Sequence, residues 1–167
     1  LLLGFALASQ LFSIMANFII PIFTPHLVQS YSEKSKNSRY ISFKNYLLKV
    51  APFLILTLIL SLLFSETLIR ILVDKSKIQD ELITIFNIGL FVEFLRSLIS
   101  VIKNYKLSEN RLIYQVYSLI IPLIFLFLTP FIPINSTIIF ALYMFFIYFI
   151  YFVTSVLFSI KLKNEIP

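Results

Sequence analysis

The chain has 167 residues, of which 59% are hydrophobic and 13% are charged, and its mean hydropathy is +0.95. This composition leaves too little polar surface to cover a water-soluble globule, and therefore predicts a protein embedded in a membrane. The net charge of +6 does not indicate a nucleic-acid partner, because the Lys and Arg residues are dispersed between apolar runs. The expected counter-charge is the anionic headgroups of membrane lipids.

The sequence contains no Cys and a single histidine, His26. It therefore excludes disulfides, thiolate metal sites, a cysteine nucleophile and a multi-histidine metal cluster. We find no Ser-His-Asp pattern, glycine-rich phosphate loop or metal-ligand spacing either. We predict no catalytic residue, no metal and no cofactor, and a protein that is not an enzyme.

The apolar residues are gathered in five long runs. A helix needs about 20 residues to cross the ~30 Å hydrocarbon core of a bilayer. Transmembrane β-strands would be about half as long and would alternate in polarity, which these runs do not. The sequence thus predicts an all-α polytopic membrane bundle with transmembrane helices at about residues 1–28, 46–65, 82–102, 112–131 and 138–160.

The first run and the gap after it carry more detailed expectations. Residues 1–8 have neither a Met nor a basic segment, and we take the chain as a fragment of a longer protein. Pro21 and Pro25 each remove a helical hydrogen bond, which predicts a kink or an early end to the first helix. The polar gap at residues 31–45 contains aromatic and aliphatic side chains, and fits either a short helix on the membrane surface or a solvated loop.

Basic residues alternate between the two sides of the predicted bundle. The side that holds the first gap, the third gap and the C-terminal tail carries ten of them, against three on the other side. By the positive-inside rule, the C-terminus is cytoplasmic and residue 1 lies outside. The ten are Lys34, Lys36, Arg39, Lys44, Lys49, Lys103, Lys106, Arg111, Lys161 and Lys163, and the three are Arg70, Lys75 and Lys77.

Two charged residues lie inside an apolar run. Glu93 and Arg96 are three residues apart on the third helix and are therefore placed to pair. Intramembrane charges commonly mark a functional cavity. The alternative is a structural pair, because Arg96 lies about 9 Å from Ile102 and could extend its side chain toward the headgroups. The same helical face carries Gly89, Ser97, Ser100 and Asn104.

Three other helices carry uncharged polar stripes. Such stripes either join helices through hydrogen bonds or contact a substrate, and finding them on four helices favours a shared polar interior. The second helix has only Thr57 and Ser61 in its middle, and both can bond to their own backbone, so it is the helix we expect to face lipid. The stripes are Gln10, Ser13 and Asn17, then Gln115, Ser118 and Pro122, then Tyr148, Tyr151 and Ser155.

Three segments resemble the C-terminal lobe of the Wzx-type oligosaccharide flippases, which belong to the multidrug/oligosaccharidyl-lipid/polysaccharide exporter superfamily. The helix GFALASQLFSIMANFIIPIFTPHL at 4–27 has interior Gln and Asn residues and ends in a Pro-x-x-x-Pro exit. SETLIRILVDKSK at 65–77 follows the second helix, and KNYKLSENR at 103–111 is a short basic turn. The family has no invariant catalytic motif, so the resemblance assigns no site residue.

The resemblance implies a protein with two six-helix lobes, of which residues 1–167 are the C-terminal lobe, helices 8 to 12, and the N-terminal lobe is missing. It implies transport of a polyprenyl-pyrophosphate-linked oligosaccharide to the outer leaflet of a bacterial inner membrane, for polysaccharide or O-antigen synthesis. The partners would be this substrate and membrane lipids, with a glycan polymerase as a further candidate. Arg96 would meet the anionic head and Glu93 would hold Arg96 or couple protons, while Gln10, Asn17 and Gln115 would bind sugar hydroxyls.

Two other functions remain open at the level of the sequence. One is an integral-membrane glycan polymerase, ligase or acyltransferase, although the outer gaps are short for such an enzyme. The other is a drug or small-metabolite exporter of the same superfamily, which would differ in the chemistry of its cavity.

Overall fold

The computed structural model describes residues 2–31, 36–73, 80–108, 112–129 and 136–164. Within these ranges the chain forms helices and no strands, which confirms the predicted all-α bundle. The helices are α1 (Leu2–Tyr31), α2 (Lys36–Leu63), α3 (Ser65–Leu72), α4 (Asp80–Ser108), α5 (Leu112–Leu128) and α6 (Thr137–Asn164).

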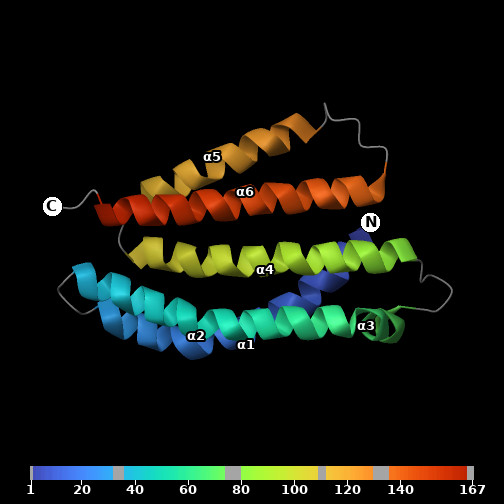
Figure 1. The fold of residues 1–167 in the computed structure, drawn as a ribbon, viewed down its shortest axis with the longest axis horizontal. Helices are drawn as coiled ribbons and strands as arrows, with labels where there is room; N and C mark the ends of the chain where they lie inside the picture. The colour runs from blue at the N-terminus through green and yellow to red at the C-terminus, as the bar shows by residue number, and fades with distance from the viewer. Residues whose placement is uncertain (1, 32–35, 74–79, 109–111, 130–135, 165–167) are drawn as a thin grey trace.

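Helix α4 lies at the centre of the bundle (Figure 1). It packs against α1 and α2 on one side and against α6 on the other, and α5 covers α6 from outside. Helices α4 and α6 run in the same direction, so their C-terminal ends lie at the same end of the bundle, where α2 begins. The described ends of α1, α4 and α6 and the starts of α2 and α5 therefore lie at one end of the bundle, which agrees with the alternation of basic residues along the chain.

Four of the helices are long and apolar enough to cross a membrane. Their spans are Leu3–Pro25, Ile41–Leu63, Asp80–Lys103 and Thr137–Leu157. Helix α5 is shorter, with 17 residues and a length of about 25 Å at 1.5 Å per residue. The described chain is therefore a helical membrane bundle with four full spans and a shorter fifth helix.

Helix α1 does not end early at its prolines. It continues through Pro21 and Pro25 to Tyr31, so the expected early termination is wrong. Packing against α2 holds this part of α1, where the rings of Phe23 and Phe53 lie 5.5 Å apart between centroids. Contacts of this kind outweigh the backbone hydrogen bonds that two prolines remove.

The gap between the first two spans also differs from both expectations. Lys36 begins α2 and the helix runs without a break into the membrane span, so the residues after 35 form neither a separate surface helix nor a loop. Phe43 and Tyr46 are buried on the bundle side of these first turns. Residues 32–35 lie outside the described part of the chain.

Helix α3 was not expected, because it is only eight residues long and lies in a gap rich in charge. It buries Ile69 against the bundle and leaves an ion pair between Glu66 and Arg70 exposed. An i,i+4 pair with its acid on the N-terminal side stabilises a short helix of this kind. The structure therefore places a short amphipathic helix of about two turns at the end of the bundle.

We expected α2 to be the helix that faces lipid, but another helix is less covered by the rest of the bundle. Thr57 donates a hydrogen bond to the carbonyl oxygen of Phe53 at 2.9 Å, as predicted. However, Thr57 and Ser61 are both buried, and α2 covers the core with Val50 and Leu54. The span of α6 has a smaller buried share, 11% against 33% for α2, so α6 has the wider apolar face for lipid.

Helices α5 and α6 are joined by hydrogen bonds to backbone carbonyls. Pro122 has no N–H group, so the carbonyl of Ser118, four residues earlier, loses its helical partner. The buried hydroxyl of Thr154 on α6 lies 3.2 Å from this carbonyl and 3.0 Å from the carbonyl of Tyr151 on its own helix, so its one proton is shared between the two oxygens. Nearer the other end of α5, the hydroxyl of Tyr143 donates to the carbonyl of Phe125.

We predict that Thr154→Val destabilises the bundle by about 0.6 kcal/mol, because it removes an interhelical bond and leaves the Ser118 carbonyl unsatisfied in hydrocarbon. In a Pro122→Ala background the restored N–H group satisfies this carbonyl, so the same substitution should cost close to nothing. Equilibrium unfolding in mixed micelles measures the four proteins of this cycle. If Thr154→Val lowered the stability equally in both backgrounds, the Thr154 hydroxyl would not be the group that satisfies the Ser118 carbonyl.

Candidate functional site

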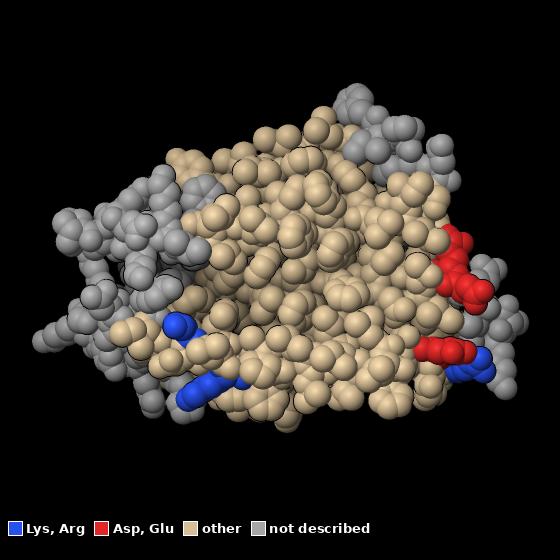
Figure 2. Space-filling view, viewed as in Figure 1, with Lys and Arg blue, Asp and Glu red and all other residues tan. Residues whose placement is uncertain are grey.

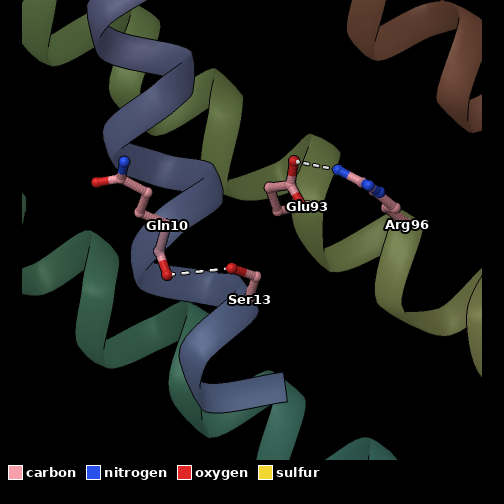
Figure 3. A network of polar contacts seen from close by, with 4 residues as sticks. All are labelled: Gln10, Ser13, Glu93 and Arg96. Carbon is pink, nitrogen blue, oxygen red and sulfur yellow. Dashed lines mark hydrogen bonds and ion pairs between the residues drawn. The ribbon is translucent and has the colours of Figure 1, made fainter. Parts of the chain in front are cut away.

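The site is built around the ion pair that the sequence placed inside the third span. Arg96 Nη1 lies 3.3 Å from Glu93 Oε1, one turn along α4 (Figure 3). The two partners are covered very differently, because the side chain of Glu93 is 10% exposed and that of Arg96 is 60% exposed. The carboxylate is thus part of the bundle, and the guanidinium is presented outside it.

The pair lies near the middle of the membrane span. Glu93 is 13 residues after Asp80 and 10 residues before Lys103, the limits of the α4 span, or about 20 Å and 15 Å from them. Arg96 is about 10 Å from Lys103 by the same measure. An unpaired charge at this depth costs ~3 kcal/mol, and the neighbouring opposite charge reduces that cost.

Close packing of α1 against α4 determines which part of the polar face remains uncovered. A Cβ atom added at Gly89 would lie 2.8 Å from the Cβ of Ala8, so the two backbones nearly touch there. Beyond this contact, at successive turns of the same face, Arg96, Ser100 and Lys103 are exposed. They form an uncovered polar strip from the middle of the span to its end, which we call the α4 strip.

The polar residues of α1 are not directed at this pair. Ser13 donates its hydroxyl to the carbonyl of Gln10 at 3.2 Å, and the amide of Gln10 points away from Glu93 and Arg96 (Figure 3). Gln10 and Asn17 are both exposed on the outside of α1. They are available to a ligand or to another protein surface, but the described chain does not bring them into contact with the ion pair.

The four polar stripes do not form one shared interior. Ser118 and Thr154 are buried at the α5–α6 contact, where the Thr154 hydroxyl reaches the carbonyl of Ser118, whereas the ion pair lies on α4. The expectation of a common polar cavity within these helices is therefore wrong. The side chain of Gln115 lies outside the described part of the chain.

One polar group at membrane depth was missed by the sequence analysis. Asn87 lies on α4, and its Oδ1 atom is buried with no hydrogen-bond partner among the described residues. It does not share the face of Gly89 and Glu93, so a search for one polar stripe passes over it. A count of every polar residue within the span would have found it.

The two ends of the bundle differ in charge. Lys and Arg residues gather at one end and Asp and Glu residues at the other, beside one further basic group (Figure 2). We call the first the basic end, with the described residues Lys44, Lys49 and Lys103, and the second the acidic end, with Glu66, Arg70, Asp80 and Glu81. No three His, Asp or Glu side chains come together as metal ligands in the described ranges.

Comparison with known proteins adds no relative. No protein-family model, no curated protein and no solved structure matches the chain.

Proposed function

We propose that this chain is part of a transporter that moves a polyprenyl-pyrophosphate-linked oligosaccharide from the cytoplasmic to the outer leaflet of a bacterial inner membrane. The observation that supports it best is an exposed guanidinium inside a membrane span, held by a buried carboxylate near the middle of that span. A guanidinium in contact with lipid alone has a high free-energy cost. The anionic head of a substrate that moves across the bilayer would supply its counter-charge. The α4 strip extends this polar surface to the basic end.

In this proposal Arg96 binds the pyrophosphate. A guanidinium has five N–H donors in a planar fork that matches phosphate oxygens, and the described contact with Glu93 runs through one nitrogen. Glu93 holds the guanidinium at depth and balances its charge when no substrate is present. Gln10 and Asn17, which are exposed on α1, bind sugar hydroxyls that a substrate presents from outside these helices. Gln115 is a further candidate for the same role.

The proposal is tested by reconstituting the protein in vesicles with a fluorescent polyprenyl-pyrophosphate-linked disaccharide in both leaflets. A membrane-impermeant reductant then bleaches the label that is exposed outside. With a flippase present, the bleached fraction should rise from about half to nearly all of the label. A bleached fraction equal to that of protein-free vesicles would contradict the proposal, and efflux of a cationic dye instead would identify a drug exporter.

The proposed orientation places the basic end in the cytoplasm and the acidic end outside, following the positive-inside rule. The chain has no Cys, so Asp80→Cys and Lys103→Cys place single thiols at opposite ends of α4. We expect an impermeant maleimide to label Asp80→Cys in intact cells, and Lys103→Cys only after permeabilisation. The reverse pattern would invert the proposed topology.

A further inference from the structure

Helix α3 lies across the acidic end of the bundle. The membrane span of α2 ends at Leu63, and α3 begins two residues later at Ser65. In Figure 1, α2 runs along the bundle and α3 is seen nearly end-on, so the chain turns sharply between them. Backbone hydrogen bonds continue through the turn, because the N–H of Phe64 donates to the carbonyl of Leu60 at 3.0 Å and the N–H of Leu68 donates to the carbonyl of Phe64 at 2.8 Å. These bonds hold α3 at the boundary of the span.

The side chains of α3 form three sectors around its axis. Ser65 and Ile69 are buried against the bundle. Glu66 and Arg70 form the exposed ion pair. Roughly opposite this pair, at about 3.6 residues per turn, lies a sector of apolar side chains with the i, i+4, i+7, i+8 spacing of an amphipathic helix. This apolar sector consists of Phe64, Leu68, Ile71 and Leu72.

The apolar sector is largely uncovered by the bundle. Phe64, Ile71 and Leu72 are all exposed, and Ile71, at 74%, is the most exposed large hydrophobic residue in the described ranges. If α3 projected into water, burial of these side chains would be lost. If α3 lay wholly in hydrocarbon, its ion pair would be there too, which is unfavourable. Only the interface between the two satisfies both sides of the helix.

The apolar sector also continues the outer apolar face of α2. Ile59, Leu60 and Leu63 are exposed on the last turns of the α2 span, and Phe64 follows them directly. Acyl chains that contact this face of α2 therefore reach the apolar sector of α3 as well. One lipid surface accounts for both faces, without a further protein segment.

We propose that α3 is an interfacial helix whose partner is the lipid bilayer at the acidic end. Its apolar sector lies among the acyl chains, and the pair of Glu66 and Arg70 lies among the headgroups and water. Because α3 contacts both α2 and α4, its binding to the bilayer fixes the depth of these two spans. The inference depends neither on the proposed transport function nor on which side of the membrane the acidic end occupies.

The test uses the absence of Cys from the chain, because one introduced Cys then carries a nitroxide spin label at a chosen position. Ile71→Cys places the label on the apolar sector, Glu66→Cys is the matched control on the charged side of α3, and Ile59→Cys gives the reference for lipid contact on α2. The full chain is reconstituted in phosphatidylcholine vesicles. Relaxation of the label by oxygen, which partitions into hydrocarbon, is compared with relaxation by a water-soluble nickel chelate.

We expect oxygen to dominate at Ile71→Cys, as at Ile59→Cys, with a label depth of about 5–10 Å below the headgroups. The nickel chelate should dominate at Glu66→Cys. If the nickel chelate also dominates at Ile71→Cys, the apolar sector lies in water. If the label there is immobile and neither reagent relaxes it, the sector lies against protein. Either result would overturn the inference.

A matched pair of acidic substitutions tests the same helix without relying on a label at residue 71. With the label at Leu72→Cys, Ile71→Asp should move it toward water, because a carboxylate does not enter the acyl chains. Thr67→Asp, at an exposed position of α3 outside the apolar sector, should leave the depth unchanged. Equal label depths in the Ile71→Asp variant and in its parent would contradict insertion of the apolar sector.

Discussion

Arg96→Ala is expected to lower transport of the lipid-linked oligosaccharide by about 10- to 150-fold, while the amount of protein in the membrane stays the same. The loss corresponds to about 1.5–3 kcal/mol, the contribution of a hydrogen bond to a charged group. Arg96→Lys should retain part of the activity, because it keeps the charge but not the planar fork. Initial rates in the vesicle assay provide the measurement.

Two controls separate binding from structure. Arg70→Ala removes an arginine from the exposed Glu66–Arg70 pair on α3, at the acidic end and outside the span, and should transport normally. Because Arg96→Ala leaves the carboxylate of Glu93 buried and unpaired, the double variant with Glu93→Gln is also needed. If the double variant restored full transport, Arg96 would only balance Glu93 and would not act on the substrate.

Gly89→Ala should destabilise the bundle by about 1–3 kcal/mol, the usual cost of overpacking a close contact. The new methyl group would lie 2.8 Å from the Cβ of Ala8, and a backbone-anchored methyl cannot rotate away. Gly89→Leu should prevent α1 from packing on α4 and reduce the folded yield sharply. Unfolding in mixed micelles and the recovery of monodisperse protein measure the two effects.

The matched rescue is Ala8→Gly. It removes the atom that the new methyl group would meet, so the double variant Ala8→Gly with Gly89→Ala should regain most of the lost stability. If Gly89→Ala has no effect, or if Ala8→Gly fails to compensate for it, the close approach of α1 and α4 is not as described.

The fold was predictable where hydropathy determines it. The membrane spans of α4 (Asp80–Lys103) and α6 (Thr137–Leu157) lie close to the predicted spans at 82–102 and 138–160, because apolar runs of this length have no other stable state in a bilayer. The ends were less predictable, since α2 extends into the polar segment before residue 46. Helix propensity and the burial of Phe43 stabilise the first turns of α2 outside the hydrocarbon. The length of an apolar run cannot predict such an extension.

The candidate site was predictable only in part. The three-residue spacing of Glu93 and Arg96 correctly gave their contact, because helical geometry alone brings such residues together. The periodicity of polar residues shows which of them share a helix face, but it does not show which neighbouring helix that face contacts. The stripes of α1 and α5 were therefore assigned to one interior, although Gln10 is exposed and Ser118 is buried against α6.

In the proposed mechanism, the α4 strip lines the path of the substrate. Ser100→Cys places the only thiol of the chain on this strip, one turn beyond Arg96, and Phe149→Cys places one on the apolar face of α6. We expect a charged methanethiosulfonate to label Ser100→Cys at least about tenfold faster, because a thiol in apolar surroundings forms little thiolate. Added polyprenyl-pyrophosphate-linked oligosaccharide should slow that labelling. Equal, slow labelling of both positions without protection by the substrate would contradict the claim.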